Sequence, residues 1–202
     1  ESMNDNSFSY QENILSTFYI LLEMYKDEIL LLKKSSMKDY IARKIEKAEA
    51  GDPVAQNDLG VDYEEGNGVP LDYEKAFFWY SKAAEQGYVT ALSNLGCCYR
   101  DGRGVDQSYE KAKEWFEKAV EQGDALGQFH VGWLYFCGYG VEQDYKKSLE
   151  FWILSAEQRD ETAMFNIGTL YLNGQGVEKS YEKAVEWFKK AAEEGHDEAI
   201  YT

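Results

Sequence analysis

Apolar residues recur along this chain at helical spacing and at one long, fixed period. Ala91, Leu95 and Tyr99 lie at positions i, i+4 and i+8, which places them on one face of a helix. The register returns every 36 residues, and each copy has a glycine five residues after its first position: Gly60, Gly96, Gly132 and Gly168. A fixed period of about 20 to 50 residues is typical of stacked supersecondary units. The chain is therefore predicted to be all-α and to form an elongated array of helix-turn-helix repeats.

A second helix is predicted in each unit after a Gly-x-Gly turn. The residues that would begin it are Asp72, Ser108, Asp144 and Ser180. Asp and Ser are good N-caps, because their side-chain oxygens accept hydrogen bonds from free backbone N–H groups. The glycines that would end it in a left-handed conformation are Gly87, Gly123 and Gly195. Repeat 3 departs from the pattern, since Arg159 replaces this glycine.

The N-terminal segment differs from the repeats. Tyr10 to Lys33 is predicted to be a long helix, and Met37 to Ala50 a degenerate second helix of a repeat. Together, residues 1–54 are predicted to cap the apolar end of the array. The apolar stripe of the long helix is Ile14, Phe18, Leu21, Leu22, Tyr25, Ile29 and Leu32. Charged residues within this segment argue against a membrane span or a signal peptide.

The motif Leu-Gly-x-x-Tyr-x-x-Gly-x-Gly-Val, followed by Lys-Ala-x-x-Trp-Phe-x-Lys-Ala, resembles the Sel-one-like repeat (SLR) family. The resemblance covers four units, at 55–90, 91–126, 127–162 and 163–198, and residues 199–202 open an incomplete fifth unit. It implies a right-handed α-solenoid (an α/α superhelix) that scaffolds protein complexes, often in bacteria. The family brings no catalytic residues.

Charge narrows the choice of partners. The net charge is −16, of which the first 50 residues carry −2 and the rest −14. Such a surface repels nucleic acid and anionic membranes and attracts basic partners. A role in solubility alone is the alternative interpretation.

Candidate chemistry is sparse. His130 occupies a polar repeat position without a nucleophile or carboxylate partner in the sequence pattern, so no enzyme activity is expected. We expect no metal or cofactor, since no ligand spacing occurs. Cys97, Cys98 and Cys137 form no disulfide framework, which favours a reducing compartment and a cytoplasmic protein.

A partner-binding surface is predicted on the first helix of each unit, at the slots opposite the Ala/Leu/Tyr stripe. In the related tetratricopeptide architecture these slots line the concave groove. The apolar candidates are Phe129, Trp133, Phe136, Phe165 and Leu172. The polar candidates are Asn57, Asp58, Asp62, Glu64, Ser93 and Arg100. The alternative is that neighbouring units cover these side chains.

The predicted function is therefore that of a binding module, which holds a peptide or protein of basic character along its groove. The alternative is an immunity or inhibitor protein that neutralises a basic toxin such as a nuclease. A homodimer is also predicted. It would form through a patch of Ile153 and Leu154 beside Trp152 or through the open C-terminal unit. An external partner on these surfaces is its alternative.

Overall fold

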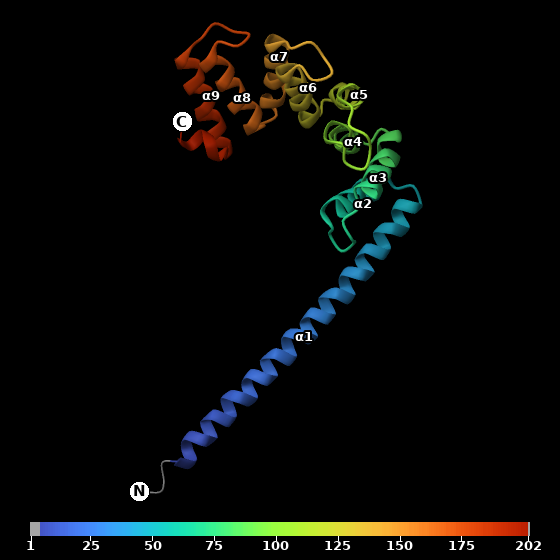
Figure 1. Ribbon diagram of the computed structural model, residues 1–202, viewed down its shortest axis with the longest axis vertical. Coiled ribbons are helices and arrows are strands. Elements are labelled where there is room, and N and C mark those ends of the chain that lie inside the picture. The colour runs from blue at the N-terminus through green and yellow to red at the C-terminus, as the bar shows by residue number, and fades with distance from the viewer. Residues whose placement is uncertain (1–4, 202) are drawn as a thin grey trace. The chain divides into compact units, whose positions relative to one another are not determined.

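The computed structural model describes residues 5–201, with the side chains of residues 19–199 apart from 20, 22, 27, 33 and 34. Over this range it contains nine α-helices, one 3-10 helix and no strand (Figure 1). The helices are α1 (Asp5–Glu49), α2 (Pro53–Glu65), α3 (Tyr73–Glu85), α4 (Val89–Asp101), α5 (Tyr109–Glu121), α6 (Ala125–Cys137), α7 (Tyr145–Glu157), α8 (Glu161–Asn173), α9 (Tyr181–Glu194) and the 3-10 helix η1 (Asp197–Tyr201). The chain divides into two compact units, Glu1–Glu46 and Lys47–Thr202.

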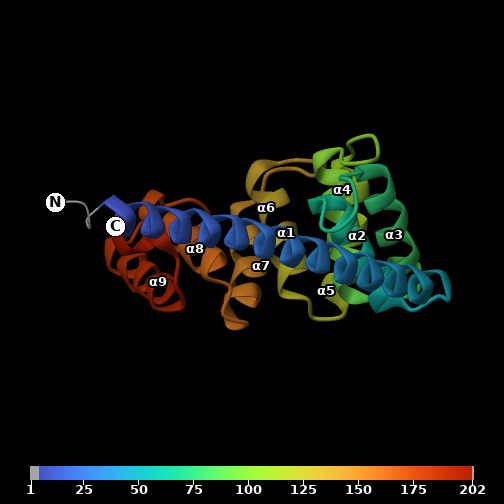
Figure 2. The same cartoon turned by 90° about the horizontal axis from the view of Figure 1, so that it is seen from below.

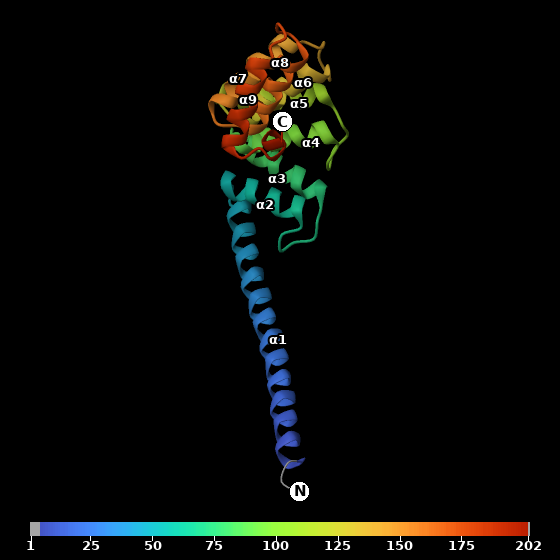
Figure 3. The same ribbon diagram turned by 90° about the vertical axis from the view of Figure 1, so that its left-hand side faces the viewer.

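Over its described residues, the N-terminal unit consists of a single helix. α1 runs without interruption from Asp5 to Glu49, where two helices were expected (Figure 3). The segment between the expected helices, Lys34-Ser35-Ser36, contains neither glycine nor proline. A serine costs a helix only about 0.5 kcal/mol relative to alanine, so two serines do not end it. The role of this segment as a cap stays a prediction.

In the second unit, each repeat contributes an A helix and a B helix. The A helices are α2, α4, α6 and α8, and the B helices are α3, α5, α7 and α9. Each A helix packs against the B helix of its own repeat, and each of α3, α5 and α7 packs against the next A helix (Figures 1 and 2). The A helices α4 and α6 also contact each other. This is the stacked arrangement that the period predicts.

Caps fix the helix ends as expected. Asp72 Oδ1 accepts from the backbone N–H of Lys75 at 3.0 Å, and Ser108 Oγ from that of Lys111 at 3.3 Å. Asp144 and Ser180 cap α7 and α9 in the same way. The glycines that follow the B helices, Gly87, Gly123 and Gly195, all have positive φ. The predicted boundaries of the B helices are therefore confirmed.

The core lies between the A and B helices. The first members of the predicted stripe, Ala91 and Leu95, are buried. Where Gly132 stands in α6, a Cβ would lie 2.6 Å from Trp152 Cδ1, so the missing side chain lets α7 approach. Trp152 is 1% exposed, and its indole N–H donates to the carbonyl of Phe129 at 3.1 Å. Trp152 therefore adds nothing to the predicted surface patch of Ile153 and Leu154, because it occupies the core slot that Phe116 fills in repeat 2.

Repeat 3 keeps the regular geometry in spite of its departures. Its B helix, α7, has 13 residues, like α3 and α5. Arg159 takes φ 69°, the left-handed conformation of the glycines that it replaces. Its guanidinium pairs with Glu194 of the next repeat, with Nη2 2.9 Å from Oε2. Of the two residues predicted to mediate self-association, Leu154 is 42% exposed and Ile153 is half-buried against the core.

Candidate partner-binding surface

The predicted partner contacts lie along the A helices. We call the side chains at three equivalent positions of each A helix the A-helix surface. Its members are Asn57, Val61 and Glu64; Ser93, Cys97 and Arg100; Phe129, Trp133 and Phe136; and Phe165, Thr169 and Leu172. The structure connects neighbouring members across repeats, as where Arg100 of α4 reaches α6.

Three polar residues predicted for partner contact are buried in the array. Ser93 is 0% exposed and donates to Asp124 Oδ2 at 2.6 Å. Asp124 is the N-cap of α6, so Ser93 supports the start of the next repeat. Asn57 accepts from Asn94 Nδ2 at 3.0 Å, and Asp62 is 8% exposed. Asn57 and Ser93 belong to the packing between repeats, because each bonds to a residue of the following repeat, and the burial of Asp62 likewise leaves it little surface for a partner.

A polar network joins repeats 1 and 2 at the A-helix surface. Asp101 accepts a bidentate pair from Arg100, at 2.6 Å to Nε and 2.8 Å to Nη2, and a further bond from Arg103. Arg103 also donates to Glu64, which accepts from the Tyr80 hydroxyl at 2.6 Å. The hydrogen bonds from Arg100 and Arg103 lower the pKa of Asp101 to about 2. The predicted acidic dock is therefore partly neutralised by the chain's own arginines, whereas Asp58 is exposed.

His130 lies beneath this network and is buried. Arg100 Nη1 donates to His130 Nδ1 at 3.0 Å, and His130 Nε2 lies 3.4 Å from Cys97 Sγ. A guanidinium only donates, so Nδ1 accepts and the ring proton lies on Nε2. Burial, and then the Arg100 charge, lower the pKa of His130 to about 3. A neutral imidazole held in this way positions Arg100.

The aromatic half of the surface begins beside Arg100. Trp133 is half-buried, with the Arg100 guanidinium 5.8 Å from its ring centroid and Tyr139 edge-on at 5.3 Å. Phe136 packs against Trp152 and Tyr145, both at 5.4 Å between centroids. Phe129 also lies against the core cluster around Trp152. Neighbouring side chains thus hold these rings in place while each ring stays partly exposed, which gives a rigid apolar contact area.

The last repeat continues this surface and is partly covered. The ring of Phe165 stacks on His196, with centroids 4.4 Å apart and planes 9° apart. These two rings and the start of η1 line an open cavity of about 490 Å³ with acidic residues, among them Glu161, Asp197 and Glu198. Leu172 is half-buried. One face of the Phe165 ring is therefore covered by His196.

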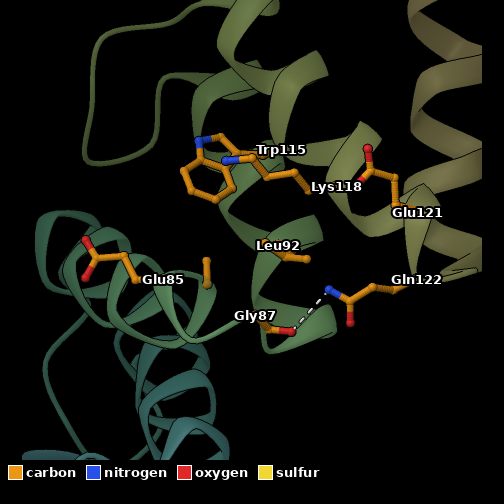
Figure 4. A pocket seen from close by; sticks show the side chains of 8 residues that line it. Glu85, Gly87, Leu92, Trp115, Lys118, Glu121 and Gln122 are labelled. Carbon is orange, nitrogen blue, oxygen red and sulfur yellow. Dashed lines mark hydrogen bonds between the residues drawn. The ribbon is translucent and has the colours of Figure 1, made fainter.

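A second cleft lies on the B-helix side, between α3, α4 and α5 (Figure 4). It has a volume of about 440 Å³, and Gln122 Nε2 spans it to donate to the carbonyl of Gly87 at 3.3 Å. The Lys118 ammonium covers the ring of Trp115 at 3.7 Å from its centroid. The remaining charged groups of the cleft are Glu85 and Glu121. The internal pairings of Trp115 and Gln122 favour a structural role for this cleft.

Sequence analysis missed two residues of the network, Asp101 and Arg103. Asp101 is the last residue of α4 and Arg103 lies in the turn that follows, which was interpreted only as a helix breaker. A compositional signal was present, since two of the chain's four arginines, Arg100 and Arg103, fall in this one turn region. Its meaning depends on Glu64, which lies 39 residues earlier along the chain.

Helix pairs that repeat and stack along the chain define an α-solenoid repeat protein, here a right-handed one. The profile described as Sel1 repeat matches residues 53–88, 89–124, 125–160 and 162–196. The chain belongs to the Sel1 repeat family. Proteins of this family generally mediate protein–protein interaction, and the fold is a non-catalytic interaction scaffold.

Solved structures agree with this assignment. A protective antigen of uropathogenic Escherichia coli strains that displays an SLR fold is 38% identical, with a TM-score of 0.74 over 79% of this chain and 34% of that chain. A Sel1 repeat protein from Oxalobacter formigenes is 36% identical, with a TM-score of 0.71 over 74% of this chain and 61% of the other. The match thus spans about a third and three fifths of these two proteins.

An immunity protein from Pseudomonas aeruginosa shares the fold at 21% identity, with a TM-score of 0.58 over 82% of this chain and 61% of that one. Comparison with curated proteins gave no significant match. Among the described residues, no helix has both the length and the apolar character needed to cross a membrane.

Proposed function

We propose that this chain is a non-enzymatic binding module whose A-helix surface holds a peptide or protein segment. The observation that carries the proposal is the row of half-buried aromatic rings in repeat 3, next to a cationic and acidic network in repeats 1 and 2. Aromatic residues and arginine are common anchors at protein interfaces. Rings that are already fixed lose little conformational freedom when a partner binds.

Trp133 is the central anchor of this proposal. It is fixed by Arg100 on one side and by Tyr139 on the other, and it stands where the polar and apolar parts of the surface meet. A partner segment would then place apolar side chains on repeat 3 and basic side chains near the exposed Asp58. The charge of −14 over the repeats favours the basic part of this ligand.

The test is peptide selection by phage display on the full chain and on two variants. Trp133→Thr introduces the residue that repeat 4 has in the same slot, Thr169, so the array should still fold. Phe78→Ala is the matched control, because Phe78 is an exposed aromatic on a B helix. We expect peptides with apolar and basic residues to be enriched on the full chain and on Phe78→Ala.

Affinity of the selected peptides for Trp133→Thr should fall by about 2 kcal/mol, or roughly 30-fold, as for an interface hot spot. If the peptides bound the full chain and Trp133→Thr with equal affinity, Trp133 would not be part of the binding site. Equal loss in both variants would mean that the peptide contacts are not confined to the A helices, which would contradict the A-helix surface as the site.

A second candidate function is inhibition of a basic enzyme. The acidic charge of the repeats supports it, because opposite charge accelerates the capture of a basic partner. It predicts an association rate that falls steeply between about 0.05 and 0.5 M salt, where screening becomes strong. A rate that is indifferent to salt argues against this role.

A further inference from the structure

We propose that α1 pairs in antiparallel orientation with α1 of a second copy of this chain. Over the described residues, the unit Glu1–Glu46 contains no element other than α1. A single helix of 45 residues therefore carries a large apolar surface that its own unit does not bury.

Large apolar side chains are open along much of α1. Those between 47% and 74% exposed are Tyr19, Leu21, Met24, Tyr25, Ile29, Leu30, Leu31, Leu32, Met37 and Tyr40. Leu21, Tyr25, Ile29 and Leu32 follow one another at spacings of four, four and three residues, so they form one stripe. Such spacing is the pattern by which one helix packs along another. Contiguous apolar surface of this kind marks an interaction site.

The stripe has a definite extent. Its last large member is Tyr40, because the next positions on the same face are Arg43 and Lys47. In the other direction the sequence continues the spacing to Ile14, whose side chain lies outside the described residues. The midpoint is therefore Asp27, about which two antiparallel copies would be centred.

Charge selects a second copy and the antiparallel orientation. The first part of α1, residues 5–25, contains three acidic residues and no basic one. Residues 26–49 contain seven basic and five acidic residues, which gives this part a net charge of +2. Antiparallel pairing places the acidic part of each copy along the basic part of the other copy. Parallel pairing places parts of like charge beside each other. Opposite charges flanking a helix seam set its orientation.

The repeat arrays favour the same orientation. Each array carries about −14 and follows directly after Glu49. In a parallel pair the two arrays would start about 10 Å apart, the spacing of packed helices, which is close to one Debye length. In the antiparallel pair they would start about 65 Å apart along the helix axis, at 1.5 Å per residue, where salt screens them from each other.

Two neighbouring residues provide a matched test of the interface. Ile29 lies on the stripe, and Leu30 lies about 100° around the helix from it. We expect the full chain at micromolar concentration to sediment as a dimer. Ile29→Lys should raise the dissociation constant at least tenfold, while Leu30→Lys should change it by less than threefold. Thermal unfolding of the array, followed by circular dichroism, checks that both variants remain folded.

Orientation is measured with a spin label at residue 40, in a Tyr40→Cys variant whose cysteines Cys97, Cys98 and Cys137 are replaced by alanine. The antiparallel pair predicts about 40 Å between the two labels, from 26 residues at 1.5 Å each. A label distance near 10 Å would mean a parallel pair and overturn the orientation. A monomeric full chain, a dimer that survives Ile29→Lys, or equal loss in both variants would overturn the stripe as the interface.

Discussion

Gly96 of α4 faces the ring of Phe116 of α5 with no room for a side chain between them. A Cβ at residue 96 would lie 2.5 Å from Phe116 Cε1, and Phe116 is completely buried. The same pairing joins Gly132 to Trp152 in the next repeat. The recurrent glycine of the A helices therefore sets the distance between the two helices of a repeat, and its effect can be tested.

Gly96→Ala should destabilise the array although alanine is the better helix former. The propensity gain is about 1 kcal/mol. The overlap with a rigid ring that has no free space is expected to outweigh it and to leave a net loss of about 2 kcal/mol in the free energy of unfolding. Chemical denaturation measures this loss. Adding Phe116→Leu makes room for the new methyl group, so the double variant should be at least about 1 kcal/mol more stable than additivity predicts. Strict additivity would contradict the steric explanation.

Arg159→Gly should stabilise the protein. Arg159 has φ 69°, a conformation that is unfavourable for residues with a Cβ, and glycine adopts it freely. The ion pair with Glu194 is lost in this variant, but the Arg159 side chain is 78% exposed and solvent screens the pair. Glu194→Gln isolates the ion-pair effect. The converse change, Gly123→Ala, should cost about 1 kcal/mol, because Gly123 has φ 78°. A lower melting temperature for Arg159→Gly than for Glu194→Gln would contradict this account.

Removal of His130 should flatten the pH dependence of stability. The pKa of His130 is lowered to about 3 in the folded state, against about 6.5 when unfolded, so below pH 6.5 the unfolded chain binds a proton that the folded one does not. Stability from the neutral ring is full above pH 6.5 and is lost as the pH falls. Between pH 6.5 and 4.5 this loss is about 2 kcal/mol.

His130→Asn introduces the residue that repeats 2 and 4 have in this slot, Asn94 and Asn166. Its unfolding free energy, measured against that of the full chain across this range, should lack that slope. Carboxylates contribute equally to both proteins and cancel in the difference. Parallel pH profiles for the two proteins would mean that His130 is accessible to protons in the folded state.

Ser93→Ala should lower stability and leave partner binding unchanged. Its hydroxyl is buried and bonded to Asp124, so its loss should cost about 1 kcal/mol. Asp124→Ala should cost more, since it removes the N-cap of α6 and leaves the Ser93 hydroxyl without this acceptor. In the Ser93→Ala background the cost of Asp124→Ala should be smaller. If a peptide selected on the full chain failed to bind Ser93→Ala, Ser93 would be a partner-contact residue after all.

Sequence alone determined the solenoid, because its signals are local and repeated four times. The caps Asp72 and Ser108 and the left-handed Gly87 act within a few residues of their own backbone, so their spacing is sufficient to predict the helix ends. The apolar slots of the core follow from helical geometry in the same way. In α1 two helices were predicted where the structure has one, because the segment between them, Lys34-Ser35-Ser36, contains no residue that ends a helix.

Only the tertiary structure decided which side chains of the A helices are available. Asn57 and Ser93 occupy the same slot as Phe129, yet the polar pair is buried by bonds to the next repeat while the ring is half open. These bonds join residues that lie 31 and 37 positions apart. Burial of a slot depends on the size and polarity of what the following repeat places over it. Periodicity fixes the direction of a side chain, whereas packing between repeats fixes whether it reaches solvent.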